Sequence, residues 1–253
     1  METVNAGSYK VMGIINLTDN SFVSESRLVG AGCDQIVARV ERMLDEGADI
    51  IDVGACSSAP GNALVDEETE WKRLKEPLTA LFGAFPDIVF SIDTFRSGIV
   101  KKILPLRDNF IVNDIFCGRD DKALLPLAAE EGLGYIAMDS SDDPLHFFES
   151  FAERAENEGL RQWILDPGFG FGKSLEQNLN ILENLEAFKR FGRPVLAGMS
   201  RKRMIYLPLN LTASTCSEAS VAAELKAVGK GADIIRTHDV AAHKSRVVRQ
   251  ASR

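Results

Sequence analysis

The chain has 253 residues, a net charge of −8 and a pI near 5.1, and 45% of its residues are hydrophobic and 26% charged. This balance is typical of a globular protein, and the acidic charge argues against a nucleic-acid binder, which needs a dominant basic surface. No window approaches about 18 unbroken apolar residues, and residues 1–10 lack the basic start and apolar run of a secretory signal, so we expect no membrane contact and a cytoplasmic location.

Short β-branched runs alternate with stretches of helical period from one end of the chain to the other. The expected strands are 11–17, 49–53, 88–94, 110–115, 135–138, 163–166, 194–198 and 233–237. The expected helices are 34–46, 66–85, 96–104, 123–131, 144–158, 175–191, 217–230 and 240–251. In the first helix, Ile36, Val37, Val40, Met43 and Leu44 share one face.

Eight strand–helix units of this kind favour parallel strands with right-handed crossovers, closed into a TIM barrel. We therefore expect a single (β/α)8 domain spanning residues 1–253. An open, doubly wound sheet has the same local pattern and remains the alternative. The segment Gly-Ala-Asp-Ile-Ile occurs at 47–51 and again at 231–235, and it predicts a glycine helix stop followed by a strand.

The four cysteines, at positions 33, 56, 117 and 216, contain no C-x-x-C pair, which argues against a zinc site or a disulfide framework. We expect reduced thiols. The glycine-rich run 168–174 fails the P-loop pattern, because Pro167 stands where the first glycine is required. Its glycines are better suited to letting backbone approach a flat ring.

Polar residues follow most of the predicted strands, at the end where a parallel barrel builds its site. Asp93, Asn113 and Asp166 come directly after apolar runs, and buried carboxylates there need N–H donors such as the edge of a guanidine-like heterocycle. Lys202, Arg236 and His238 follow the last two strands, the usual anion-binding quarter. Acids and amides thus come mainly from one half of the barrel and bases from the other.

Several polar residues also have a purely structural interpretation. Asp52, Asp114 and Asp239 could be helix caps or loop anchors. Cys56 lies in a loop at the site face without a histidine nearby in sequence, which favours an inert thiol. Among the three histidines, 146 and 243 fall on predicted helices and are interpreted as surface residues.

Along nearly its whole length the chain resembles dihydropteroate synthase, the sulfonamide-inhibited family of the folate pathway. The matching segments are 12–18 (MGIINLT), 47–54 (GADIIDVG), 91–94 (SIDT), 113–114 (ND), 166–173 (DPGFGFGK), 200–202 (SRK) and 236–239 (RTHD). The resemblance implies a TIM barrel, a homodimer, Mg²⁺ as cofactor, and two substrates, a pterin diphosphate and p-aminobenzoate.

The resemblance also assigns roles to residues. The pterin would be held by Asp93, Asn113, Asp166 and Lys202 and lined by Ile115, Met138 and Phe171. Pyrophosphate and p-aminobenzoate would meet Asn16, Ser58, Pro60, Ser200, Arg201, Arg203, Arg236 and His238, with Asn16 also near Mg²⁺. Asp93, Lys202, Arg236 and His238 would form the catalytic group. The implied reaction is displacement of pyrophosphate by the amine of p-aminobenzoate through a cation-like pterin methylene, without a side-chain nucleophile.

The chain departs from the family pattern in its loops. The first loop replaces the family's Pro-Asp with Asp19-Asn20, and the second has Cys56-Ser57-Ser58-Ala59-Pro60-Gly61 in place of Glu-Ser-Thr-Arg-Pro-Gly. The usual arginine is therefore absent, and Arg203, where the family often has serine, is a candidate substitute. Position 139, often histidine, is aspartate. The pterin half is retained better than the aminobenzoate half, which leaves open a pterin-binding paralogue with little condensation activity, or a pterin-dependent methyltransferase.

Overall fold

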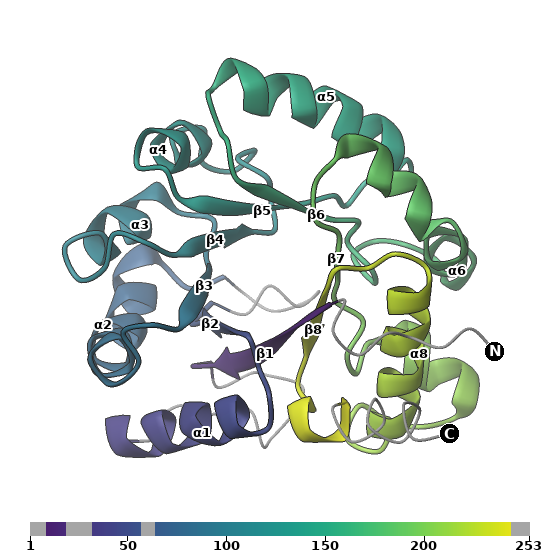
Figure 1. Cartoon of the computed structure of the whole chain (residues 1–253), viewed down its shortest axis with the longest axis horizontal. Helices are drawn as coiled ribbons and strands as arrows, with labels where there is room; N and C mark the ends of the chain where they lie inside the picture. The colour runs from purple at the N-terminus through teal and green to yellow at the C-terminus, as the bar shows by residue number, and fades with distance from the viewer. Residues whose placement is uncertain (1–8, 19–31, 57–63, 244–253) are drawn as a thin grey trace.

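The computed structural model describes residues 9–18, 32–56 and 64–243. Within these ranges strands and helices alternate along the chain, with the strands grouped at the centre and the helices outside them (Figure 1). The strands are β1 (Lys10–Asn16), β2 (Ile50–Gly54), β3 (Val89–Asp93), β4 (Ile111–Asp114), β5 (Gly134–Met138), β6 (Trp163–Asp166), β7 (Leu196–Ala197) and β8 (Ile234–Thr237). The α-helices are α1 (Cys33–Asp45), α2 (Glu67–Ala84), α3 (Ser97–Ile103), α4 (Leu124–Glu130), α5 (Pro144–Asn157), α6 (Leu175–Glu183), α7 (Arg203–Tyr206) and α8 (Ser217–Gly229), and the 3-10 helices are η2 (Leu185–Phe191) and η3 (Leu207–Leu209).

All paired strands are parallel, in the order β6-β5-β4-β3-β2-β1-β8-β7. A parallel bridge between Leu165 and Val195 joins the two ends of this sheet, and the Leu165 amide donates to the carbonyl of Pro194 at 2.9 Å. An open sheet would leave these edges apart. The predicted TIM barrel is therefore confirmed, and the open alternative is excluded.

The barrel interior changes from apolar to polar along the strands. Its first layer is a buried cluster of Met12, Ile50, Ile136, Leu196 and Ile234, against which Ile111 of β4 packs. Side chains alternate faces along a strand, so the residues two positions later also point inward. In β2, β4 and β8 these are Asp52, Asn113 and Arg236. The fold thus sets its charged residues above an apolar floor at the carboxyl ends of the strands.

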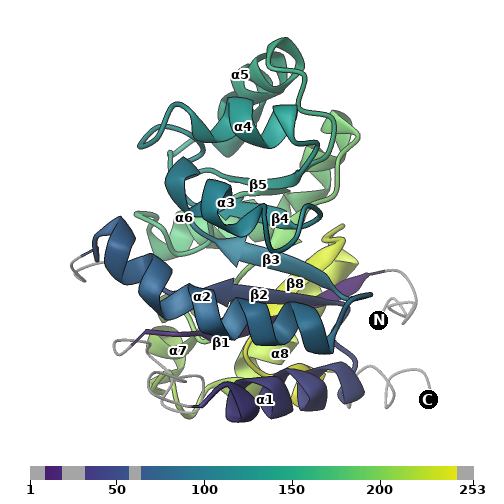
Figure 2. The same ribbon diagram turned by 90° about the vertical axis from the view of Figure 1, so that its left-hand side faces the viewer.

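The larger core lies between the strands and the surrounding helices; Figure 2 shows α2, α3 and α4 towards the viewer, with α1 below them and α5 above. In α1, Ile36, Val40 and Met43 are buried, as the sequence period predicts. Each such side chain contributes roughly 1.5–3 kcal/mol by leaving water. Gly13 of β1 allows the close approach of this helix, since a Cβ there would lie 2.5 Å from Cε of Met43.

The two Gly-Ala-Asp-Ile-Ile segments adopt the same local structure. Gly47 and Gly231 both adopt left-handed backbone, with φ of 100° and 104°. The carboxylate of Asp49 then accepts the amide of Val11 at 2.8 Å, and that of Asp233 accepts the amide of Val195 at 2.8 Å. Each aspartate therefore ties the start of its strand to the neighbouring strand of the barrel.

The structure differs from the predicted elements in three places. The predicted helix 175–191 breaks at Asn184, whose amide nitrogen donates to the carbonyl of Asn180 at 2.9 Å, and continues as the 3-10 helix η2. Of the strand predicted over 194–198, only Leu196–Ala197 forms β7, with Val195 adding the single bridge to Leu165, and the short helices α7 and η3 were not predicted. Of the predicted helix 240–251, residues 240–243 are helical and the rest lies outside the described residues.

The interpretation of His243 as a surface residue is wrong. Its side chain is fully buried, 3.7 Å from the carboxylate of Glu224 and edge-on to the ring of Tyr9. His146 is exposed on α5, as predicted. Within the described ranges, no helix is both long enough and apolar enough to cross a bilayer.

Candidate active site

An arginine lies at the centre of the charged network in the barrel mouth. Nε of Arg236 donates to Asp52 at 2.7 Å, and its Nη2 lies 2.6 Å from Asp52 and 3.0 Å from Asp93. Asp52 is fully buried and also accepts Ser91 Oγ at 2.6 Å and Asn113 Nδ2 at 3.2 Å. Side chains of β2, β3, β4 and β8 therefore meet in one hydrogen-bonded cluster.

Burial and neighbouring charges shift the pKa values of the groups in this cluster. Burial raises the pKa of Asp93 to about 7, although the neighbouring Arg236 acts to lower it. Burial acts to lower the pKa of Arg236, but Asp52 and Asp93 outweigh it and raise that pKa above its ordinary value. The arginine therefore stays charged, while Asp93 is placed to gain or lose a proton near neutral pH.

The second acid, Asp166, faces the same interior from β6. Its Oδ1 accepts the amide of Gly168 at 2.8 Å. A Cβ built on Gly198 would lie 3.9 Å from both Asp166 Oδ2 and Arg236 Cβ, which places the acid and the arginine on either side of this glycine. Burial raises the pKa of Asp166, and the positive charge of Lys202 counters this rise.

Lys202 reaches the site from the N-cap of α7. Its Nζ donates to the carbonyl of Phe169 at 2.5 Å and lies 4.6 Å from the ring centroid of Phe171. Burial lowers the pKa of Lys202 to about 8. The lysine is therefore held between an aromatic face and a backbone carbonyl, beside Asp166.

An apolar patch adjoins these polar groups. Cys56, Phe95, Ile115 and Met138 form a buried cluster, and Phe171 packs against it. The three residues predicted to line a flat ring, 115, 138 and 171, are thus in one place. Burial raises the pKa of the Cys56 thiol, which suits an inert side chain rather than a nucleophile.

His238 and Ser200 form a hydrogen-bonded pair at the ends of β8 and β7. Ser200 Oγ accepts the His238 amide at 3.2 Å and lies 3.1 Å from Nδ1. Burial lowers the pKa of His238 to about 3, and the neighbouring Arg236 acts in the same direction. In this setting the neutral imidazole of His238 is favoured, and its role at an anion site stays a prediction.

Arg201 and Arg203 occupy different settings. Arg201 Nε donates to Asp239 at 2.9 Å, and its backbone is left-handed at φ 56°. Asp239 is thus the anchor that the structural interpretation expects, and Asp114 is another, accepting the Tyr135 hydroxyl and the Gly118 amide, each at 2.6 Å. Arg203 is exposed at the start of α7.

Asn16 ends β1 and pairs in register with Gly54. Its side chain is half-buried, and the described residues give its amide no hydrogen-bond partner. Those residues contain no group of three His, Cys, Asp or Glu side chains that could hold a metal. Ser58, Pro60 and the altered positions Asp19, Asn20 and Ala59 lie outside the described residues.

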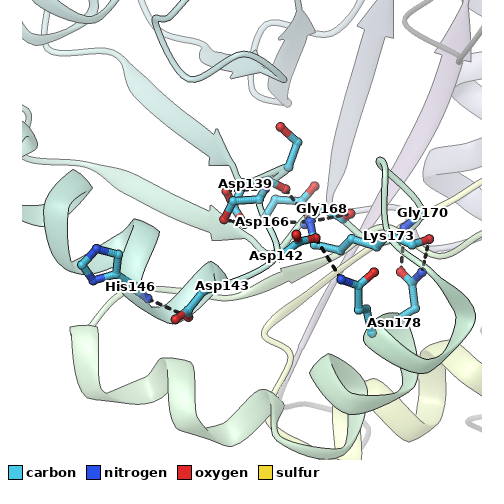
Figure 3. A network of polar contacts seen from close by, with 12 residues as sticks. Asp139, Asp142, Asp143, His146, Asp166, Gly168, Gly170, Lys173 and Asn178 are labelled. Atoms are coloured by element: carbon cyan, nitrogen blue, oxygen red, sulfur yellow. Dashed lines mark hydrogen bonds and ion pairs between the residues drawn. The ribbon is translucent and has the colours of Figure 1, made fainter.

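The loop after β6 is held by Asn178 and Lys173, neither of which was predicted as a site residue (Figure 3). Asn178 of α6 accepts the Gly170 amide at 2.7 Å and donates to the carbonyls of Ser174 at 2.7 Å and Lys173 at 3.2 Å. Lys173 donates to the carbonyl of Asp139 at 3.1 Å. The sequence did contain a signal that Asp52 belongs to the site, since it lies at a strand end as Asp93 does. No pattern in the sequence marks Asn178.

Comparison with known proteins decides the relationship. The model of the family described as "Pterin binding enzyme" matches residues 12–238. The chain belongs to this pterin-binding enzyme family. Within the family it is 37% identical to the dihydropteroate synthase of Clostridium beijerinckii, over 91% of this chain and 88% of the relative.

Solved structures of pterin-binding enzymes agree. Dihydropteroate synthase of Xanthomonas albilineans with 4-aminobenzoic acid superposes with a TM-score of 0.85 at 30% identity, over 97% of this chain and 93% of that one. The Thermus thermophilus enzyme in complex with 6HMPPP gives a TM-score of 0.81 at 32% identity, over 98% and 95%. The predicted resemblance to dihydropteroate synthase is therefore confirmed, and the chain is a transferase of that group.

Proposed function

We propose that this chain condenses 6-hydroxymethyl-7,8-dihydropterin diphosphate with p-aminobenzoate to give 7,8-dihydropteroate and pyrophosphate. The observation that carries the proposal is the convergence of Asp93, Asn113 and Asp166 in one barrel mouth beside the apolar patch. Two acids and an amide above an apolar wall suit the amino and ring N–H groups of a pterin.

In this proposal the pterin edge donates to Asp93 and Asp166, while Asn113 and Lys202 complete its polar contacts. Ile115, Met138 and Phe171 cover the faces of the ring. Asp93 accepts hydrogen bonds better when it is ionised than when it is protonated. Its raised pKa, about 7, means that both forms are accessible near neutral pH. The carboxylates also favour a pterin system that becomes positively charged as its methylene carbon loses pyrophosphate.

The leaving pyrophosphate is assigned to Arg236, His238, Ser200 and Asn16. Arg236 supplies positive charge and two N–H directions, which suit phosphate oxygens. His238, being neutral, serves as a hydrogen-bond donor rather than as a second cation. Together with Lys202 these groups stabilise charge that develops on the departing oxygen, so no covalent intermediate with the protein is required.

The residues present fit Mg²⁺ with few protein ligands. Among the described residues the side-chain amide oxygen of Asn16 has no hydrogen-bond partner, while Asp52 and Asp93 are engaged by Arg236. Mg²⁺ commonly keeps several waters and is bound by one or two side chains plus substrate phosphates, so Asn16 and a diphosphate suffice. The ion would supply charge neutralisation of the diphosphate.

The p-aminobenzoate side is assigned to Ser58, Pro60, Arg201 and Arg203. Arg201 is already paired with Asp239, so the exposed Arg203 is the better candidate to replace the missing second-loop arginine. We also propose a cytoplasmic homodimer. The exposed leucines 207, 209 and 211 around η3 are the kind of apolar surface that an interface covers.

A silent, pterin-binding paralogue is the second candidate, because the second loop departs from the family pattern where the aminobenzoate is expected. The dihydropteroate synthase relatives favour the synthase group over a methyltransferase. One experiment separates the two remaining functions: pyrophosphate release is measured with the pterin diphosphate, p-aminobenzoate and Mg²⁺.

Release that requires both substrates, and that Lys202→Ala abolishes, supports the condensing enzyme. Pterin binding without release, at any p-aminobenzoate concentration, supports the paralogue. Absence of pterin binding contradicts both functions.

A further inference from the structure

A buried ion pair lies behind the proposed pterin pocket. The side chains of Lys173 and Asp139 are 1% and 0% exposed, and Lys173 Nζ lies 3.8 Å from Asp139 Oδ2. The same ammonium donates to the Asp139 carbonyl at 3.1 Å and to the Gly168 carbonyl at 3.4 Å (Figure 3). One lysine head therefore joins the end of β5 to the loop after β6.

This loop has little structure of its own to hold it. Gly168, Gly170 and Gly172 all have left-handed backbone, with φ of 68°, 79° and 67°. A Cβ on Gly168 would approach the Asp139 carbonyl oxygen to 1.7 Å, so the two chain segments are in direct contact there. Glycine-rich backbone loses much conformational freedom on ordering, so such a loop depends on outside contacts for a fixed position.

The loop carries three parts of the proposed pterin pocket. Its Gly168 amide binds Asp166, its Phe169 carbonyl accepts Lys202, and its Phe171 ring lies beneath the Lys202 ammonium and against the apolar patch. Displacement of the loop would therefore move the hydrogen-bond partners of Asp166 and Lys202 together with the Phe171 ring.

Asp139 is itself rigidly held. Its Oδ1 accepts the Ser141 amide and its Oδ2 the Ser141 hydroxyl, both at 2.9 Å, and its own amide donates to the Asp166 carbonyl at 2.9 Å. A lysine buried without a counter-charge is strongly unfavourable. Aspartate at position 139 supplies that charge in this chain, where the resembled family often has histidine.

We propose that Asp139 and Lys173 are a positioning pair that fixes the 168–171 loop and thereby sets the affinity of the pterin pocket. Both side chains are buried, so they are assigned no direct contact with the pterin and act through Gly168, Phe169 and Phe171. The inference rests on the proposed function, since it names residues that support the same pocket.

The test measures the dissociation constant of 6-hydroxymethyl-7,8-dihydropterin by calorimetry for the full chain, Asp139→Asn, Lys173→Met and the double variant. Matched controls are Asp233→Asn and Lys189→Met. Asp233 also pairs with a lysine, at 2.5 Å, and accepts one backbone amide, but it lies at the opposite end of the barrel. Melting temperatures are recorded for all of them.

Each single variant is expected to weaken pterin binding at least tenfold, whereas the controls stay within twofold of wild type even where they lower the melting temperature. The double variant should lose less than the product of the two single losses, because no uncompensated charge remains. The KM for the pterin diphosphate should rise more than kcat falls. Lys173→Met should also move the acid limb of binding to higher pH, since Lys173 lowers the pKa of Asp166.

Folded single variants with wild-type affinity would overturn the proposal, as would controls that lose affinity in step with the single variants. If the single variants do not fold, the double variant decides: tenfold weaker binding supports the pair, and wild-type affinity overturns it. A wild-type chain that binds no pterin contradicts the proposed function instead.

Discussion

Arg236 contacts two acids because the barrel closes through β8 next to β1, which brings the end of β8 within reach of β2 and β3. Asp52 is fully buried, with polar partners on β3, β4 and β8, and serves as the fixed counter-ion. Asp93 keeps a partly open carboxylate and a raised pKa. The two acids therefore divide the work: one anchors the arginine, and the other is available to a ligand.

This difference predicts pH-dependent pterin binding. With a pKa of about 7, Asp93 is mostly protonated at pH 6 and mostly ionised at pH 8. Because the ionised form accepts pterin N–H groups, affinity for a pterin without diphosphate should rise about tenfold between these pH values. Asp93→Asn should remove most of this rise and weaken binding at pH 8 by roughly 1.5–3 kcal/mol, the usual contribution of a hydrogen bond to a charged group.

Titration calorimetry at several pH values checks both effects, with Asp87→Asn, a surface substitution, as the control. An equal pH dependence in wild type and Asp93→Asn would contradict the assignment. The sequence could locate Asp93 and Asp166 because each follows an apolar strand run. It could not separate the anchoring role of Asp52, since that role depends on an arginine 184 positions away in the chain.

The helices and strands were predictable where a single pattern governs them. The α1 period, the glycine stops before β2 and β8, and the eight strand positions are local signals, and the structure follows them. The break between α6 and η2 could not be predicted, because apolar residues continue across it. Only the side chain of Asn184, which donates back to Asn180, competes with the helical backbone there. Short α7 has too few residues to show a period.

Helix α6 provides a prediction for a helix terminus. Ser174 and Gln177 form a capping box, in which the Gln177 amide donates to Ser174 Oγ at 3.2 Å and the Ser174 amide donates to Gln177 Oε1 at 2.6 Å. Ser174→Ala removes the acceptor of the Gln177 amide and should lower the free energy of unfolding by about 1 kcal/mol. Urea unfolding measures this loss.

The matched control is Glu176→Ala, in the same turn, which removes only a charge near the helix N-terminus and should cost less than about 0.5 kcal/mol. Equal losses from the two substitutions would show that the capping box adds no more stability than a single charge in the first turn.

At the scale of the whole molecule, a buried cluster joins the first and last parts of the described chain. Tyr9, just before β1, packs edge-on against His243, which follows β8, and His243 in turn lies beside Glu224 of α8. Among the described residues, neither the Glu224 carboxyl oxygens nor the His243 ring nitrogens have a hydrogen-bond partner. Burial raises the pKa of Glu224 and lowers that of His243 to about 4. Sequence could not reveal this cluster, because a histidine on a helix shows no sign of which face is covered.

The cluster predicts how stability responds to acid. Unfolded His243 binds a proton below about pH 6.5, whereas folded His243 resists protonation until about pH 4. Stability from His243 is therefore present above pH 6.5 and is lost as the pH falls toward 4, by about 3 kcal/mol at roughly 1.4 kcal/mol per pKa unit. Glu224 acts oppositely: its raised pKa favours the folded state at low pH and disfavours it as the pH rises.

Denaturant unfolding of wild type and His243→Phe between pH 4 and 7 tests this linkage. The variant should lose less free energy of unfolding as the pH falls, while His146→Phe, at an exposed position, keeps the wild-type dependence on pH. A variant whose stability falls as steeply as wild type over this range would show that His243 carries no such linkage.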